Sequence, residues 1–221
     1  MRKKTRKSPE KALVWKDGVG YLPIDTSRKP YDRHYFERLQ KQERTAIQCE
    51  EVKLHIKMVQ QAISYRRTPV YLLDVGCGSG HFLRELKRTT QIHGQGIDIN
   101  EKSIQWLIQK QMSVTREKYT FLTFWDSFCH CELPDEIIRA YDPAYIGISL
   151  PIFTCKEQIT KSDLFLSDEV HWYFTKFGFI EKMKQLGYCI LESSYDLSTK
   201  FHKDHYQSFI FARIRMNNHI Q

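Results

Sequence analysis

Residues 72–80 read Leu-Leu-Asp-Val-Gly-Cys-Gly-Ser-Gly, an apolar run that ends in three glycines at alternate positions. The run Val70–Val75 is short, apolar and bounded by Pro69 and Gly76, which is typical of a strand buried in a parallel sheet. Glycines let the backbone turn sharply and pass close to a ligand. A helix predicted over Gly80–Arg88 would direct its N-terminal amides at that ligand. The stretch therefore predicts an α/β sheet with a binding site at this turn.

A carboxylate follows at the end of the next predicted strand. Gly94–Ile99 is a second short strand, and Asp98 lies 18 residues beyond Gly80. A carboxylate can accept hydrogen bonds from both hydroxyls of a ribose, which neutral side chains match poorly. The loop differs from the dinucleotide-binding pattern G-x-G-x-x-G, because its third glycine is Gly80 and position 81 is histidine. The pyrophosphate site of a dehydrogenase is therefore not indicated.

Residues 72–80 together with Asp98 resemble the first two motifs of class I S-adenosylmethionine-dependent methyltransferases, of the type 11/12/23 group. The resemblance implies a Rossmann-like fold, methyl transfer as the activity and S-adenosyl-L-methionine as the cofactor. The methionine part would lie on Asp74 and the glycine loop, and the ribose on Asp98. The residues implied to bind the cofactor are Asp74, Gly76, Cys77, Gly78, Gly80, Asp98, Ile99, Asp126 and Ser127. The alternative is an ordinary strand–turn–helix unit with Asp98 as a strand-end residue.

The resemblance extends over most of residues 31–213. Tyr119–Ser127 resembles the group's fourth strand, which often continues as D-x-L-E-H; here Cys129 takes the Glu position and His130 the His position. Residues 168–175 resemble the group's E-H-x-x-F-F-T segment, which leads into a late helix.

The group's third strand is expected between Met112 and Lys118, where Val114 is the one apolar β-former. Either this strand is very short, or other groups hold the adenine. Asp126 and Ser127 are the candidates, because they follow the next strand.

Two histidines are candidates for a general base, because an oxygen or nitrogen acceptor must lose a proton and His titrates near neutral pH. His130 follows the fourth strand, at the edge where open α/β sheets bind ligands. His171 is predicted at the start of the late helix. For each, a surface or capping role is the alternative. Tyr31 and Tyr35 are candidate lid residues, or else pack their helix onto its own domain.

The pattern divides the chain into a basic, turn-rich segment (1–30), a helical region (31–68) and a methyltransferase core (69–221). The fold class is α/β, with a mostly parallel sheet, helices on both faces and an antiparallel C-terminal edge. No regular structure is predicted before the helical region, because this segment contains Gly18, Gly20, Pro23 and Pro30. Within the helical region, a break is predicted over Thr45–Cys49. A polar loop is predicted over Thr154–Val170. The further predicted strands are Tyr119–Trp125, Tyr145–Ser149, Cys189–Tyr195 and Gln207–Ile214, and the further helices are Glu101–Gln111, Asp135–Tyr141 and Thr175–Leu186.

The chain carries a formal net charge of +8, which suggests a nucleic-acid partner at first sight. Residues 1–11 hold six basic side chains and one Glu, so this tail supplies +5 and the other 210 residues only +3. An enzyme acting on an O or N acceptor of a small molecule is the leading hypothesis. The alternatives are a non-catalytic binding protein that uses its basic tail, and an RNA methyltransferase. The last predicts a basic face on the folded domain, built from Lys57, Arg66, Arg67, Arg84, Lys87 and Arg88.

Composition excludes several other classes. Apolar residues make up 41% of the chain, which is enough for a core and excludes global disorder. No apolar run approaches the roughly 18 residues of a membrane span. The six cysteines are dispersed, which predicts reduced thiols and a cytoplasmic protein. Cys129 and Cys131 form C-x-C, a spacing tighter than zinc sites prefer, so no metal is expected.

Overall fold

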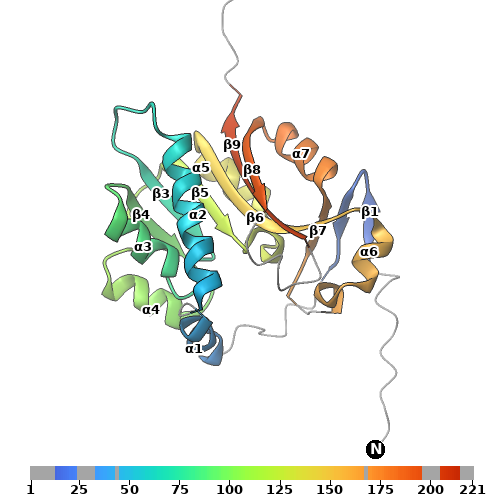
Figure 1. Cartoon of the computed structure of the whole chain (residues 1–221), viewed down its shortest axis with the longest axis horizontal. Helices are drawn as coiled ribbons and strands as arrows, with labels where there is room; N and C mark the ends of the chain where they lie inside the picture. The colour runs from blue at the N-terminus through green and yellow to red at the C-terminus, as the bar shows by residue number, and fades with distance from the viewer. Residues whose placement is uncertain (1–12, 24–32, 43–44, 167–168, 196–204, 215–221) are drawn as a thin grey trace, which may run out of the picture.

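The computed structural model describes residues 13–23, 33–42, 45–166, 169–195 and 205–214. Its centre is a parallel sheet in the order β4 (His93–Ile97), β3 (Tyr71–Val75), β5 (Phe121–Trp125) and β6 (Tyr145–Phe153) (Figure 1). Because the strands run the same way, their carboxyl ends meet at one edge. The predicted α/β fold class is confirmed.

Two strands close the sheet beyond β6. β9 (His205–Arg213) pairs antiparallel with β6 from Tyr145 to Ile152, and β8 (Tyr188–Tyr195) pairs antiparallel with β9 at the outer edge. This confirms the predicted antiparallel C-terminal edge. β6 is four residues longer than the predicted strand, because β9 continues to pair with it through Pro151.

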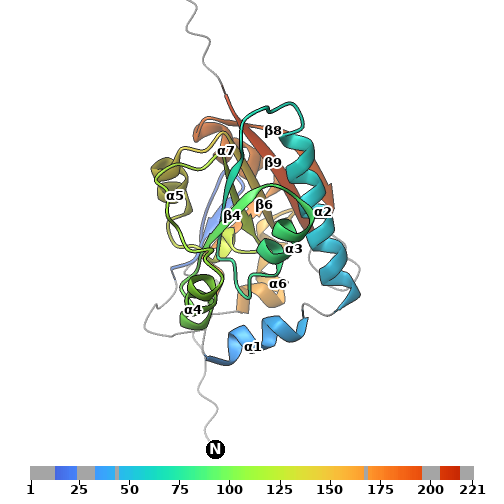
Figure 2. The same ribbon diagram turned by 90° about the vertical axis from the view of Figure 1, so that its left-hand side faces the viewer.

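Helices cover both faces of the sheet. Neighbouring residues of β3 serve opposite faces: Leu72 packs with α2 (Ala46–Ala62), α3 (His81–Thr89) and α4 (Glu101–Gln109), and Leu73 packs with α5 (Pro134–Tyr141) and α7 (Lys176–Gln185). Figure 2 shows α2 and α5 on opposite sides of the sheet. This alternation explains why the buried strands have continuous apolar runs.

The N-terminal helical region lies against this core. α1 (Arg33–Gln42) is below the carboxyl edge of the sheet in Figure 1. α2 begins after Thr45, whose hydroxyl oxygen accepts a hydrogen bond from the Gln48 N–H. The break predicted over 45–49 is therefore wrong beyond Thr45, because residues 46–49 are helical. The side chains of Val52, Ile56 and Val59 belong to the same apolar cluster as Leu72. The boundaries predicted at residues 30 and 68 stay predictions.

The segment before the helical region was predicted to lack regular structure, and that prediction is wrong. β1 (Val14–Lys16) and β2 (Val19–Tyr21) form a hairpin, in which Gly18 takes the left-handed conformation with φ of 79°. β2 pairs with β7 (Trp172–Thr175). The sequence predicted this segment only as the lead-in to the late helix, and not as a strand. Short strands gain stability from such long-range pairing, which local patterns do not reveal.

The predicted polar loop over 154–170 is also wrong in part, because it contains α6 (Lys156–Lys161) and the 3₁₀ helix η3 (Asp163–Leu166). Ile159 and Phe165 of this segment are buried with Leu13, Leu22 and Tyr173 in a third apolar cluster. The cluster lies under the β1–β2–β7 extension of the sheet. None of the helices in the described ranges is both long and apolar enough to cross a membrane.

Gly178 offers a test of how the hairpin docks. A Cβ at this position would lie 2.5 Å from the carbonyl carbon and oxygen of Gly18, and neither backbone can easily move. We expect Gly178→Ala to lower the free energy of unfolding by about 1–3 kcal/mol, as overpacking does. Helix propensity alone would give the opposite sign, because Ala favours a helix by about 1 kcal/mol over Gly.

Urea denaturation followed by circular dichroism measures the effect. Gly187→Ala is the control, because a Cβ there would meet no atom within 4 Å and only its φ of 89° is strained. A Gly178→Ala protein as stable as the wild type would contradict the docking contact.

Candidate functional site

The glycine loop folds back onto β4. The N–H groups of Gly76 and Cys77 donate hydrogen bonds to the carbonyl oxygen of Ile97, at 2.8 and 3.2 Å. Gly76 and Gly78 have φ of 74° and 55°, in the left-handed region that favours glycine. A Cβ on Gly76 would lie 2.6 Å from Cβ of Ser127, so a larger residue would collide with the segment after β5.

Asp98 ties this loop to the next one. One carboxylate oxygen accepts a hydrogen bond from the Gly78 N–H and the other from the Asn100 N–H, both at 2.7 Å. Burial raises the pKa of Asp98, and these backbone hydrogen bonds oppose that increase. Each oxygen keeps a lone pair after bonding one N–H. Asp98 can therefore hold the loop and still accept hydrogen bonds from a ligand.

Asp74 lies under the loop and is buried. Its carboxylate accepts a hydrogen bond from the Thr123 hydroxyl at 2.8 Å. Burial raises the pKa of Asp74 to about 7, which the Thr123 hydrogen bond opposes and the nearby Asp98 charge favours. A positively charged ligand group beside Asp74 would stabilise its ionised form.

A cavity of about 670 Å³ opens at the carboxyl edge of the sheet, above the glycine loop. This volume is in the range of small-molecule and cofactor sites. The cavity wall also includes residues of α1, of α2 and of the segment after β5. The predicted site residues that line it are Asp74, Gly76, Cys77, Gly78, Asp98, Ile99, Asp126, Ser127 and His130.

Gly80 is not among the residues that line the cavity. It precedes α3 with φ of 74°, and a Cβ there would lie 2.2 Å from the indole ring of Trp106. The third glycine of the loop therefore serves the packing of α3 against α4.

The third strand expected before Lys118 is very short. It amounts to one parallel bridge between Gly96 and Ser113, with the Gly96 N–H donating to the Met112 carbonyl at 2.9 Å. Ile99, at the cavity wall near this side, is 81% exposed. Its exposed apolar surface can receive a planar ring.

Asp126 and Ser127 shape the cavity beyond β5. Asp126 has φ of 55°, and its N–H donates to the hydroxyl and carbonyl oxygens of Ser149, at 2.9 and 3.2 Å. The Ser127 hydroxyl donates to the carbonyl of Val75, at the end of β3. These bonds fix the segment against both neighbouring strands.

His130 ends the 3₁₀ helix η2 (Phe128–His130), and its Nδ1 is 2.9 Å from the Glu169 carbonyl oxygen. Burial lowers the pKa of His130, whereas Cys129, the Asp126 charge and the Glu169 carbonyl raise it, and the balance is a pKa of about 10. This high pKa depends on the charges of Cys129 and Asp126 beside the ring.

His171 lies outside the cavity lining, and it precedes strand β7 rather than the predicted late helix. Its backbone N–H donates to the Cys129 carbonyl and its carbonyl accepts from the Leu22 N–H, while its ring stacks with Tyr21 at 6.4 Å. Burial lowers the pKa of His171. Its ring Nδ1 has no hydrogen-bond partner among the described residues. These contacts give His171 a structural position between β2, β7 and η2.

Sequence reasoning missed one wall of the cavity. α2 contributes Thr45, Gln48, Glu51, Val52 and His55, which recur at three- and four-residue spacing and so share one helix face. That spacing could have indicated a polar helix face, but these residues lie directly beside the apolar residues of α2 that pack on the sheet. Trp125, Ser149 and Tyr206 complete this wall.

The candidate lid is present in part. Tyr35 of α1 lines the cavity, and burial and the charges of Asp126 and Asp98 raise the pKa of its hydroxyl. Tyr31 lies outside the described residues.

The donor set fits S-adenosylmethionine. Glycine at position 76 lets the loop pass close to Ser127, and the carboxylates that line the cavity suit a ligand that carries positive charge. The part of the wall that the structure describes includes no Lys or Arg. The described residues also contain no group of three or more His, Cys, Asp or Glu side chains that could hold a metal ion.

Comparison with known proteins agrees with this geometry. The profile of a family described as a methyltransferase domain matches residues 31–142, about half of the chain. No curated protein matches the sequence.

Solved structures of similar fold differ strongly in sequence. The magnesium protoporphyrin IX methyltransferase of Synechocystis, solved with bound S-adenosylhomocysteine, is 17% identical with a TM-score of 0.58, over 85% of this chain and 98% of that one. The 1,6-didemethyltoxoflavin-N1-methyltransferase of Burkholderia thailandensis is 11% identical with a TM-score of 0.58, over 92% and 99%. At these identities the likeness shows the fold.

The raised pKa of Asp74 predicts a pH-dependent stability. The native state holds the proton of Asp74 up to about pH 7, whereas the unfolded state releases it near the ordinary pKa of an aspartate, 3.8. The unfolded state therefore binds fewer protons between these values, and stability falls as pH rises. From pH 5 to pH 8, we expect this one group to lower the free energy of unfolding by roughly 2 kcal/mol.

Asp74→Asn keeps an oxygen for the Thr123 hydroxyl and removes the titration. Urea denaturation of both proteins at pH 5 and pH 8 isolates the effect as the difference between them. An equal change with pH in wild type and variant would contradict the assigned burial of this charge.

Proposed function

Because this chain belongs to the methyltransferase domain family and is an S-adenosylmethionine-dependent class I methyltransferase, we propose that it methylates a nitrogen or oxygen of a small molecule. The observation that supports this most directly is the loop–carboxylate pair. Asp98 holds Gly78 and Asn100 at the wall of a cavity large enough for both a cofactor and an acceptor.

In the proposed site, Asp98 accepts the ribose hydroxyls and the backbone of Gly76–Gly78 lies along the methionine part. Asp74 supplies negative charge beneath it. Ile99, after β4, offers an apolar surface to the adenine. When bound, the cofactor supplies a methyl group on a cationic sulfur, which an acceptor lone pair displaces in line.

The acceptor lies beyond the ends of β5 and β6, between Asp126, His130 and α2. We propose that His130 is protonated at neutral pH and so does not act as the base there. We propose that it instead holds the Asp126 carboxylate and the Glu169 carbonyl in place. A neutral nitrogen with a free lone pair fits this site better than a hydroxyl, which must first be deprotonated. His171 lies too far into the protein wall to take part.

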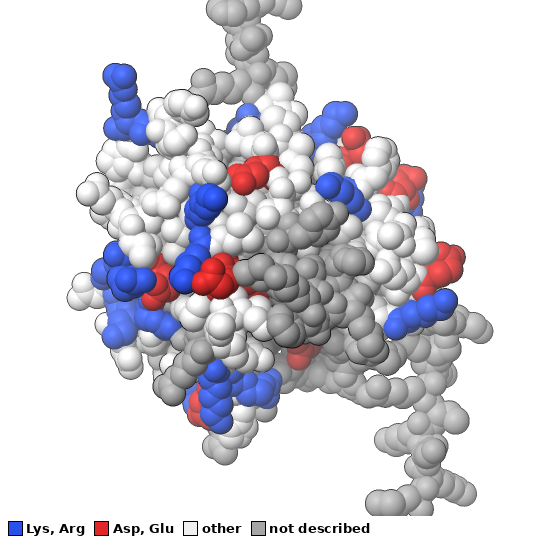
Figure 3. Space-filling model, viewed as in Figure 1, with Lys and Arg blue, Asp and Glu red and all other residues white. Residues whose placement is uncertain are grey.

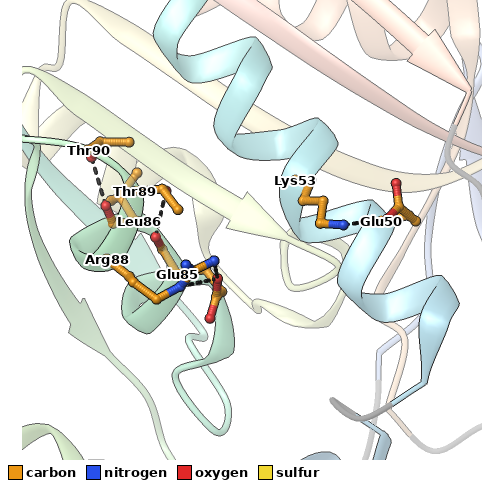
Figure 4. Close-up of polar contacts among 7 residues, drawn as sticks. All are labelled: Glu50, Lys53, Glu85, Leu86, Arg88, Thr89 and Thr90. Atoms are coloured by element: carbon orange, nitrogen blue, oxygen red, sulfur yellow. Dashed lines mark hydrogen bonds and ion pairs between the residues drawn. The ribbon is translucent and has the colours of Figure 1, made fainter.

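A small acceptor is supported by the size of the partly enclosed cavity and by the named substrates of similar structures, magnesium protoporphyrin IX and 1,6-didemethyltoxoflavin. An RNA acceptor predicts a basic face, and Arg88, one of the six residues predicted to build it, is ion-paired, as is Lys53 nearby on α2. Lys53 pairs with Glu50 at 2.6 Å and Arg88 with Glu85 at 2.7 Å (Figure 4). Acidic and basic side chains are interspersed on the face in Figure 3.

Following the methyl group tests the proposal. The purified protein is incubated with S-adenosylmethionine labelled in the methyl group and with separated cell fractions of small molecules, RNA and protein. Label in the small-molecule fraction supports the proposal. Label in RNA or protein alone would overturn it.

Asp98→Ala should abolish most cofactor binding, because it removes the ribose acceptor and the bond that holds Gly78. We expect the Kd for S-adenosylmethionine, measured by calorimetry, to rise at least about tenfold, in line with the loss of a charge-assisted hydrogen bond. Glu101→Ala is the matched control, since it removes an exposed carboxylate three residues away. Equal affinity for the two variants would show that Asp98 does not hold the ribose.

The role of His130 predicts a pH profile. If His130 stays protonated, the rate of methyl transfer for wild type and for His130→Gln should depend on pH in the same way between pH 7 and pH 9. A rise toward alkaline pH that appears only in the wild type would identify His130 as the base.

A further inference from the structure

α2 presents a polar stripe to the cavity on the side away from the glycine loop. Gln48, Glu51 and His55 follow one another at three- and four-residue spacing, so they lie on one face of the helix. Glu51 and His55 are 9% and 6% exposed. Polar side chains at buried positions of a helix that packs on a sheet do not contribute to the apolar core, so they indicate another role.

The stripe faces a rigid aromatic floor. The His55 ring stacks on the Trp125 indole at 3.9 Å and 2°, and its Nε2 is 2.9 Å from the Ser208 hydroxyl oxygen. The indole in turn occupies the space above Gly147, where a Cβ would lie 2.8 Å from the ring. These contacts fix the shape of this part of the cavity before any ligand binds.

The charges on the wall select the acceptor. Four carboxylates line the described part of the cavity, and no Lys or Arg joins them there. Asp74 and Asp98 belong to the cofactor side, and Asp126 faces the charged His130. Glu51 is thus the carboxylate of the acceptor side. Buried carboxylates accept strong hydrogen bonds from N–H groups and repel anions.

We propose that Glu51, with Gln48 and the His55–Trp125 stack, forms the acceptor subsite, and that it selects a neutral or cationic molecule with N–H groups over phosphorylated or carboxylated ones. This inference rests on the proposed function and adds the chemical class of the acceptor. Aromatic walls beside a carboxylate are a combination that favours nitrogen cations. The described part of this wall contains none of the Lys and Arg residues that make the chain basic.

The test separates the small-molecule fraction by charge. An extract of the host cells is divided by anion exchange into anionic and non-anionic pools, and each is incubated with the enzyme and methyl-labelled S-adenosylmethionine. We expect label in the non-anionic pool. Label in the anionic pool alone would overturn the subsite while upholding methyl transfer to a small molecule. No label in either pool would overturn the proposed function, and the subsite with it.

Substitutions of Glu51 then test whether this residue selects the acceptor. Glu51→Gln should raise the KM for the labelled acceptor at least about tenfold, the loss expected for a charge-assisted hydrogen bond. The Kd for S-adenosylmethionine should stay within twofold of wild type. Glu50→Gln is the matched control, because this neighbouring carboxylate is 53% exposed and pairs with Lys53 outside the cavity. An unchanged KM in Glu51→Gln would overturn the proposal.

A folding defect is distinguished by a second variant. Glu51→Asp keeps the charge and should recover part of the acceptor affinity. If Glu51→Asp and Glu51→Gln raise KM equally while both bind S-adenosylmethionine normally, the carboxylate does not select the acceptor.

Discussion

The hydrogen bonds of Asp98 hold together the parts on which the site depends. Its two oxygens bind the N–H groups of Gly78 and Asn100, so one side chain joins the loop after β3 to the loop after β4. Both loops leave adjacent parallel strands at the same edge, which is why one carboxylate can reach both. The strand register therefore sets the geometry of the ligand site before any ligand binds. The bonds also oppose the rise in the pKa of this carboxylate that its burial causes.

The parts predicted from the sequence are those encoded locally. The glycine loop, Asp98 and the parallel strands each have a pattern within a few residues, and the structure places them as expected. β1, β2 and β7 could not be predicted, because each is only three or four residues long and is stable through pairing with distant segments. Gly80 shows a further limit. Its spacing marks it as part of the loop, but its neighbour Trp106 comes from another helix.

The acceptor wall escaped prediction for a related reason. Gln48, Glu51 and His55 are adjacent to the apolar stripe of α2, and only the position of the helix over β5 and β6 reveals that they face a cavity. Trp125 similarly ends a strand of apolar residues and has no local feature that distinguishes a cavity wall from a core. The residues proposed to bind the cofactor directly follow strands. Acceptor residues come from the helical region that covers the sheet, so the two halves of one site differ in how far sequence predicts them.

The distribution of charge separates how the chain meets its surroundings from what its cavity holds. Of the +8 net charge, +5 belongs to residues 1–11, and the basic side chains of α2 and α3 include ion pairs with Glu50 and Glu85. The cavity has the opposite sign, with carboxylates along its described wall. An ion pair exposed to water contributes little energy. A carboxylate in a partly enclosed cavity interacts more strongly with the charges of a ligand, because less water screens it. In the proposed function, the charge of the cavity, rather than that of the whole chain, therefore selects the acceptor.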